Sequence, residues 1–383
     1  MESTLKTYGG AKKMIDNYYN LTKEAIELID FEGQVIDIKP FGCGLINATF
    51  IVRSLLSNNE EKRYILQKMN HYIFKDIEKL MDNYCKICDY LKDVVSSRNG
   101  DISRETITVI RAKNGKTFTK DSNGNYWRAI LFIKDTISCE TISCEDDFYK
   151  TGKAFGNFQK MLAGYDAKNL YESIPNFHNT KERFKTFLKS IEDNKSGRKE
   201  NVINEINFIL DRRNEIPLLV DMLENGELPL RVTHNDTKLS NILLDKDTRE
   251  GICVIDLDTI MPGSALYDFG DAIRSGSTFA REDEEDLNKV FFDLGLFESF
   301  TKGFLEGVDN GLTKREIEML PMGAKIITLE QGMRFLTDYL DGDLYYKVSY
   351  GDHNLVRTRT QLKLVKDLEE KWDKVNEIIK KYS

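Results

Sequence analysis

The chain has 383 residues, of which 40% are hydrophobic and 31% are charged, as in a folded protein long enough for two lobes. Its net charge of −8, without a basic stripe, argues against a nucleic-acid partner. The sequence has neither a signal-peptide core nor an apolar run long enough to cross a bilayer, so we expect a cytoplasmic protein without a membrane partner.

The first 135 residues predict a small N-terminal lobe that combines an antiparallel sheet with helices. Apolar residues at helical spacing predict helices over 14–29 and about 72–95. Asn-Gly pairs at 114–115 and 123–124 are turn signals typical of hairpins. Segments rich in β-branched and aromatic residues predict five strands, at 34–41, 48–55, 63–69, 106–112 and 125–133.

Two glycines, Gly42 and Gly44, lie between the first two predicted strands. Backbone without side chains can approach phosphate oxygens closely and donate its N–H groups to them. We therefore predict that this loop covers the phosphates of a nucleotide, with an ordinary glycine turn as the alternative. Its position ahead of the polar stretch described below favours the phosphate-binding interpretation.

Four of the six cysteines are spaced as two pairs, Cys85 with Cys88 and Cys139 with Cys144, which is the spacing of zinc half-sites. The residues around the first pair are predicted to be helical, so its two members share one face of a helix. A cysteine packs well as a small apolar residue. We therefore favour packing over zinc binding.

From residue 136 onward the pattern is mainly helical, which predicts a larger C-terminal lobe over 136–383. Residues 193–202 predict an exposed connection, and apolar residues on one stripe of 360–382 predict a packed surface helix. Two segments interrupt the helices. They are the polar stretch RVTHNDTKLSNILLD at 231–245 and an apolar strand at 251–258 that ends in two aspartates.

The spacing in these two segments matches a phosphoryl-transfer site. Asn241 follows Asp236 by five residues, and Asp256 follows Asn241 by fifteen, which is the order H-x-D-x-x-x-x-N and then a metal-binding Asp. Hard oxygen ligands suit Mg²⁺, so we predict that Asn241 and Asp256 bind this ion. Asp236 would then orient an acceptor hydroxyl and take its proton, while Lys238 reaches the transferred phosphate. The alternative is a polar loop in which Asp236 caps a helix.

Two other strings resemble kinase motifs but stand in the wrong context. The DFG string at 268–270 lies 27 residues after Asn241 and opens a predicted helix, so we expect Asp268 to brace the catalytic loop through backbone hydrogen bonds. The NGKT string at 114–117 has Ile110 where a Walker A loop requires its first glycine, and we interpret it as a turn.

Together these motifs resemble the aminoglycoside phosphotransferase and choline kinase-like family over nearly the whole chain. The blocks at 230–243 and 254–274 are typical of this superfamily, and those at 332–343 and 353–365 resemble its branch of N-acetylhexosamine kinases. The resemblance implies an α+β, two-lobed, protein-kinase-like fold. Its small five-stranded antiparallel lobe (1–135) would bind nucleotide, and its larger, mainly helical lobe (136–383) would carry catalysis and sugar binding.

The resemblance also implies ATP as co-substrate, Mg²⁺, and further site residues. Asp258 would be a second carboxylate beside the metal. In this family the third strand carries a lysine for the ATP phosphates, but Gln67 occupies the expected position here. The neighbouring Lys68 is our candidate, although side chains alternate along a strand and Lys68 therefore faces the side opposite Gln67. Many relatives also have glycine where this chain has Asn235.

For the acceptor, the resemblance implies that Asn47, Arg334 and Tyr345 contact the sugar together with Asp236. The alternatives are that Arg334 pairs with Asp338 one turn on and that Tyr345 lies in the core. The implied reaction transfers the ATP γ-phosphoryl group to the anomeric hydroxyl of GlcNAc or GalNAc.

Other activities remain open from the sequence. The acceptor of such a kinase could instead be an aminoglycoside, choline, homoserine or another sugar. A non-catalytic nucleotide-binding module is a further alternative, which the intact Asp236, Asn241 and Asp256 argue against. The sequence leaves the preference between GlcNAc and GalNAc, the tolerance at the sugar C2 and the oligomeric state undecided.

Overall fold

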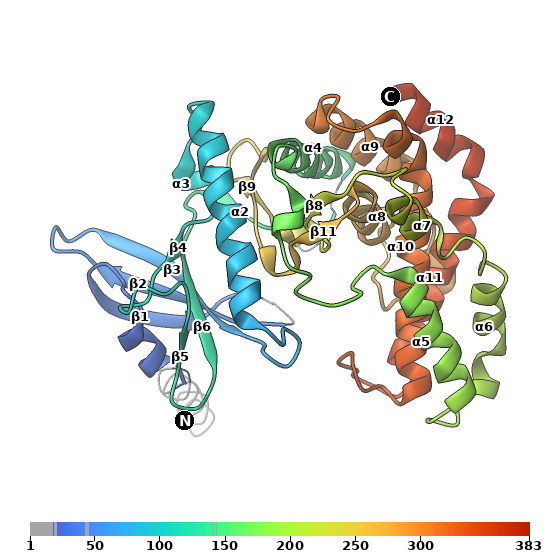
Figure 1. Ribbon diagram of the computed structural model, residues 1–383, viewed down its shortest axis with the longest axis horizontal. Coiled ribbons are helices and arrows are strands. Elements are labelled where there is room, and N and C mark those ends of the chain that lie inside the picture. The colour runs from blue at the N-terminus through green and yellow to red at the C-terminus, as the bar shows by residue number, and fades with distance from the viewer. Residues whose placement is uncertain (1–17, 19–20, 43–45, 140, 143) are drawn as a thin grey trace, which may run out of the picture. The chain divides into compact units, whose positions relative to one another are not determined.

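The computed structural model in Figure 1 describes residues 18, 21–42, 46–139, 141–142 and 144–383. The chain forms two compact units, Met1–Asp135 and Thr136–Ser383. Gly44, the second glycine of the predicted phosphate loop, lies outside the described residues. No helix in the described ranges has the length and apolar character needed to span a membrane.

An antiparallel sheet forms the centre of the first unit (Figure 1). The predicted strands are confirmed, but the fourth is shorter than expected and a sixth short strand, β5, was not predicted. The Thr106 hydroxyl donates to the Ile102 carbonyl at the end of α3 (Ile102–Glu105), so regular pairing begins only later. The strand order is β1 (Gln34–Pro40), β2 (Ala48–Leu55), β3 (Glu61–Met69), β6 (Tyr126–Leu131) and β4 (Val109–Ile110), with β5 (Thr119–Lys120) paired to β6.

Different elements pack on the two faces of this sheet. Phe50, Tyr64, Leu66 and Trp127 belong to one buried cluster, which also contains Ala25 from the helical segment 21–28. On the other face lies α2 (Ile77–Ser97), where the Arg128 guanidinium is 4.3 Å from the Tyr84 ring. This helix begins later than predicted because the Asp76 side chain caps it, accepting the Lys79 N–H at 3.0 Å.

The second unit is mainly helical and contains three short strand pairings. β8 (Arg231–Thr233) pairs with β11 (Met261–Gly263), and β9 (Ile242–Asp245) pairs with both β10 (Gly251–Val254) and β7 (Thr136–Ile137). Its helices are α4 (Glu145–Leu162), α5 (Thr180–Asp193), α6 (Ile203–Leu210), α7 (Leu218–Glu224), α8 (Ala265–Gly276), α9 (Leu294–Val308), α10 (Lys314–Asp341), α11 (His353–Glu370) and α12 (Trp372–Tyr382).

Two helix pairs shape the interior of this unit. α4 packs closely on α9, since a Cβ at Gly152 or Gly303 would collide with backbone of the facing helix. The long helix α10 packs against α5, α8 and α11 (Figure 1). Of these helices, α4 and α8 also contact β8, the strand that leads into the polar stretch predicted to be catalytic.

The prediction of one C-terminal helix over 360–382 is wrong in one respect, because α11 ends at Glu370 and α12 starts at Trp372. The residue between them, Lys371, donates from Nζ to the Phe292 carbonyl at 2.6 Å and pairs with Asp367 at 2.9 Å. These contacts tie the chain to a distant segment where the helix breaks. The predicted apolar stripe is buried on both sides of the break, at Val365, Leu368, Val375 and Ile379.

Candidate active site

The loop at 234–241 connects β8 to β9. The buried ring of His234 is one of the groups that hold its backbone in place. Its Nε2 lies 2.8 Å from the Ile255 carbonyl, and its Nδ1 lies 3.3 Å from the Asp236 N–H. A carbonyl can only accept and an N–H can only donate, so Nε2 carries the proton and Nδ1 accepts. The neutral ring therefore holds the backbone of Asp236 against the end of β10.

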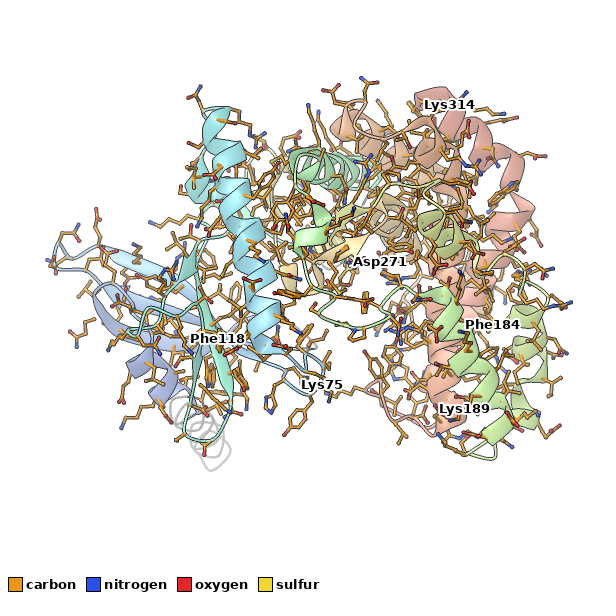
Figure 2. The ribbon with its side chains drawn as sticks, in the orientation of Figure 1. Lys75, Phe118, Phe184, Lys189, Asp271 and Lys314 are labelled. Carbon is orange, nitrogen blue, oxygen red and sulfur yellow. The ribbon has the colours of Figure 1, made fainter. Side chains whose placement is uncertain are left out.

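Asp268 braces the same loop from α8, as the sequence predicted. Its buried carboxylate accepts the N–H of His234 at 3.0 Å, the N–H of Asn235 at 2.7 Å and the Gln159 amide at 2.6 Å. Burial raises the pKa of the Asp268 carboxyl, and the hydrogen bonds from the His234 and Asn235 N–H groups and from Gln159 act against that rise. A second carboxylate on α8, Asp271, accepts the Thr237 N–H at 2.8 Å. Asp271 is itself buried, and Figure 2 labels it in the second unit.

Asn235 stands at the position where the resemblance leads us to expect glycine. Its backbone has φ of +65°, in the left-handed region that glycine adopts freely and asparagine tolerates better than most residues. Its side chain donates to the Thr233 carbonyl at 3.1 Å and to the Thr259 carbonyl at 2.8 Å. Asn235 thus adopts the left-handed conformation that a glycine would adopt freely, and its side chain adds two hydrogen bonds that hold the turn.

The structure brings Asp236, Lys238 and Asn241 together. Lys238 Nζ lies 3.0 Å from Asp236 Oδ2, and Asn241 Nδ2 donates to the same oxygen at 3.1 Å and to the Asp236 carbonyl at 2.8 Å. Burial by itself would lower the pKa of Lys238, but the nearby Asp236, Asp271 and Asp256 raise it above its usual value. The ammonium group therefore remains charged beside the predicted base.

Two predicted metal ligands, Asp256 and Asp258, follow the end of β10, and the third, Asn241, directly precedes β9. The Ile255 N–H donates to the Asn241 carbonyl at 2.9 Å, which places Asp256 next to Asn241, and Asp258 is buried two residues further on. The side-chain amide of Asn241 directs its N–H groups at Asp236, so its side-chain oxygen, Oδ1, faces away from Asp236. An amide oxygen and carboxylates are the ligands that Mg²⁺ prefers.

Asn241 and Asp256 together suit an ion that the protein shares with a nucleotide. Across the part of the chain that the structure describes, no three His, Cys, Asp or Glu side chains form a metal cluster. An ion held by Asn241 and Asp256 would therefore complete its shell with water and nucleotide oxygens, as Mg²⁺ does in phosphoryl-transfer sites. The residues present fit that role.

The register of β3 and β6 places Gln67 and Lys68 on opposite faces of the sheet. Gln67 lies opposite Arg128 and accepts its Nε–H at 2.9 Å, whereas Lys68 lies opposite Trp127. The sequence analysis missed Arg128, because only strand pairing shows that this cation shares the face of Gln67. The nucleotide role of Lys68 stays a prediction.

Two more predicted residues of the first unit have definite local roles. Gly42 has φ of +71°, so its position requires the conformational freedom of glycine. Asn47 is buried, and its Oδ1 accepts the Asn70 N–H at 2.9 Å just after β3. Their contacts with nucleotide and sugar stay predictions.

Arg334 lies on α10 beside aromatic rings. Its Nη1 donates to Gln331 at 3.2 Å, and its guanidinium is 5.4 Å from the centre of the Phe177 ring and 5.8 Å from that of Tyr346. The alternative partner, Asp338, instead accepts the Leu344 N–H at 2.8 Å and the Asn354 amide at 2.8 Å, so the alternative pairing of Arg334 with Asp338 is not the one the structure shows.

The loop after α10 presents Tyr345, which is 58% exposed and so does not belong to the core. Both oxygens of Asp338 shape this loop, accepting the N–H groups of Leu344, Tyr345 and Tyr346 at 2.8 to 2.9 Å. Asp338 is thus occupied with the loop instead of Arg334. The arrangement leaves the Tyr345 side chain available for a ligand.

The sequence analysis missed two buried residues close to the catalytic loop, His178 and Glu330. His178 Nδ1 lies 3.0 Å from Glu330 Oε2, and His178 Nε2 lies 3.4 Å from the Asn235 carbonyl. The sequence analysis gave neither residue a role, and 152 residues separate them in the sequence. No sequence signal could have paired them.

Comparison with known proteins gives one family match and several structural neighbours. Residues 119–301, which include Asp236, Asn241 and Asp256, match the model of the phosphotransferase enzyme family. A microcompartment-associated aminopropanol kinase is similar at a TM-score of 0.56 and 15% identity, over 93% of this chain and 98% of its own.

Two further neighbours cover similar shares. An aminoglycoside phosphotransferase from Alicyclobacillus acidocaldarius has a TM-score of 0.55 at 9% identity, over 93% of this chain and 95% of its own. An amicoumacin kinase in complex with AMP-PNP, Ca²⁺ and Ami has a TM-score of 0.53 at 12% identity, over 95% and 96%. The predicted α+β, two-lobed, protein-kinase-like fold is therefore confirmed.

Proposed function

We propose that this chain, whose residues 119–301 match the phosphotransferase enzyme family, is an ATP-dependent small-molecule kinase. We further propose that its acceptor is an N-acetylhexosamine, phosphorylated at the anomeric hydroxyl, so that the protein acts as an N-acetylhexosamine 1-kinase. The observation that carries the proposal is the convergence of Lys238 and Asn241 on one oxygen of Asp236, within 3.1 Å.

In this mechanism Asp236 orients the acceptor hydroxyl and receives its proton. An aspartate is a weak base, but it suffices when the transition state is loose and the proton leaves late. The anomeric hydroxyl is also more acidic than the other hydroxyls of a sugar. Lys238 stabilises negative charge on the transferred phosphoryl group, because its ammonium stays protonated. Mg²⁺ held by Asn241 and Asp256 would neutralise charge on the ATP phosphates.

The charges near the catalytic loop favour a polyhydroxy acceptor over a cationic one. Arg334 lies against Phe177, and the neighbouring Arg183 has a pKa lowered by burial and by the charge of Arg334. The buried carboxylate of Glu330 interacts with both of these arginines. A cationic amino alcohol would require an excess of carboxylates, whereas guanidinium groups can donate to sugar hydroxyls and to an acetamido oxygen.

A second candidate function is phosphorylation of a different class of acceptor. The neighbours of the same fold include a kinase named for aminopropanol and one named for amicoumacin. An amino alcohol or an aminoglycoside is therefore the alternative acceptor for this chain.

A panel of acceptors with ATP and Mg²⁺ tests the proposal. We expect ADP release only when GlcNAc or GalNAc is added, together with a phosphorus NMR signal of a sugar 1-phosphate. Because glycosyl phosphates are labile in acid, this signal should disappear on mild acid treatment. Turnover of amino alcohols alone would overturn the acceptor assignment. ATP binding without turnover of any acceptor would indicate a non-catalytic module.

A further inference from the structure

A buried histidine outside the catalytic motif lies between α10 and the catalytic loop. The ring of His178 is enclosed by the rings of Phe177 and Tyr267, whose centres are 4.7 and 5.1 Å away. Its two nitrogens face Glu330, on α10, and the Asn235 carbonyl, at 3.0 and 3.4 Å. The orientation of this ring is therefore fixed from both sides.

Both partners of His178 can only accept hydrogen bonds. The backbone carbonyl of Asn235 has no proton to give, and Glu330 is a carboxylate. Burial favours the neutral form of Glu330, but the charges of His178, Arg334 and Arg183 hold its pKa below the ordinary value. The ring thus satisfies both partners only when both nitrogens carry protons, unlike the neutral ring of His234.

The contact with Asn235 acts on the peptide group that precedes the predicted base. The Asn235 carbonyl and the Asp236 N–H belong to one planar peptide unit and point in opposite directions. His234 accepts the N–H at 3.3 Å, and His178 lies 3.4 Å from the carbonyl oxygen. Two histidines therefore clamp opposite edges of this peptide, next to a residue whose φ is +65°.

We propose that His178, held by Glu330, is a positioning residue that sets the direction of the Asp236 carboxylate. By fixing the carbonyl edge of the peptide between Asn235 and Asp236, it connects α10, which carries Arg334, to the catalytic loop. This inference rests on the proposed function of Asp236 as the base.

Single and double substitutions test this role. His178→Phe keeps a ring in the enclosure but removes both hydrogen bonds, and we expect kcat to fall by about 100-fold, the order seen for small misplacements of a catalytic group. The KM for ATP should change by less than about 2-fold, because the substitution leaves Lys238 and Asn241 in place. Glu330→Ala should lower kcat to a similar extent, and the double variant should lose little more, because the two residues act as one unit.

Two further variants separate positioning from general stability. Glu330→Gln retains an acceptor of the same shape and should lose less kcat than Glu330→Ala. The matched control is His353→Phe, since His353 is also buried and lies 3.3 Å from a carboxylate, Asp283. It should lower the melting temperature while kcat per folded molecule stays within about 2-fold of the wild type.

The outcomes distinguish this inference from the proposed function. If the wild type turns over and the kcat of His178→Phe stays within about 2-fold of the wild-type value, the positioning role alone is overturned. That role would also be overturned if His178→Phe and His353→Phe lose kcat equally per folded molecule, or if Glu330→Gln folds and loses as much as Glu330→Ala. A wild-type protein that turns over no acceptor would overturn the proposed function, and the positioning role with it.

Discussion

Asp236 receives its direction from three neighbouring groups before any acceptor arrives. Lys238 and Asn241 both approach Oδ2, and the N–H of Asp236 is bound to His234. In the proposed reaction, the other carboxylate oxygen, Oδ1, would accept the proton from the acceptor hydroxyl. A residue arranged in this way contributes through orientation as well as basicity.

Replacing the predicted base tests this arrangement directly. Asp236→Asn keeps the shape of the side chain but removes its negative charge and its ability to accept a proton. We expect kcat to fall by about 10²- to 10⁴-fold, the usual contribution of general base catalysis. Nucleotide affinity, measured by calorimetric titration with ATP and Mg²⁺, should be nearly unchanged. Near-normal turnover would contradict the assignment of Asp236.

Glu330 gives the pH dependence of stability a definite sign. Burial opposes its ionisation, but His178, Arg334 and Arg183 outweigh burial and lower its pKa. A carboxyl with a lowered pKa stabilises the fold above its unfolded pKa of about 4.3, and this contribution is lost as the pH falls through the folded value. Between about pH 7 and pH 3, Glu330→Gln should therefore lose less unfolding free energy than the wild type. Urea denaturation at both pH values measures the difference, and equal losses would refute it.

At the scale of elements, α8 supports the catalytic loop more than any strand does. Its first turns provide Asp268 and Asp271, whose carboxylates accept N–H groups on both sides of Asp236. α4 supports this arrangement through Gln159, which donates to Asp268 and to the Val232 carbonyl. The loop therefore depends on the packing of helices that lie far from it in the sequence.

Asp268→Asn tests the support from α8. An amide has one acceptor oxygen, so one of the two backbone N–H groups at His234 and Asn235 loses its acceptor, and the other keeps an acceptor without charge. Removal of a buried charge offsets part of the lost bonding, because burial disfavours the ionised form of Asp268. We expect kcat to fall by at least about 10-fold while the melting temperature changes little. A loss of stability without a loss of kcat per folded molecule would indicate a purely structural role.

At the scale of the whole molecule, the two units carry different parts of the predicted chemistry. The described part of the second unit contains the predicted base, Lys238 and the candidate metal ligands, whereas Gly42 and Lys68 belong to the first unit. The surface of the second unit is charged, with Lys189 and Lys314 exposed in Figure 2, while its catalytic loop is largely buried. We expect both units to be required for turnover.

Removal of divalent cations tests the candidate metal ligands. Dialysis against a chelator should abolish turnover, and added Mg²⁺ should restore it, since Asn241 and Asp256 would share the ion with nucleotide. The described residues hold no cluster of three acidic, His or Cys ligands, so without nucleotide the chelator should leave the melting temperature unchanged. A large decrease in melting temperature on chelation would point instead to a structural ion.

The outcome of the sequence analysis differs between local and distant features. The strands at 48–55 and 63–69 were predicted well, because alternation and turn residues act over a few positions. The short strand β5 was missed, since two residues carry no pattern of their own. The break at Lys371 was missed as well, because it depends on the Phe292 carbonyl 79 residues away.

The sequence by itself determined that Asp236, Lys238 and Asn241 lie close together, because they are at most five residues apart and that spacing is preserved in any fold. It also determined that Lys68 and Gln67 face opposite ways, since alternation along a strand is local. Only the tertiary structure decided which groups hold the loop. Asp268 lies 34 residues from His234, and Glu330 lies 152 residues from His178, so their contacts depend on how whole helices pack. Spacing encodes what a short segment can do, whereas burial and partners are properties of the packed molecule.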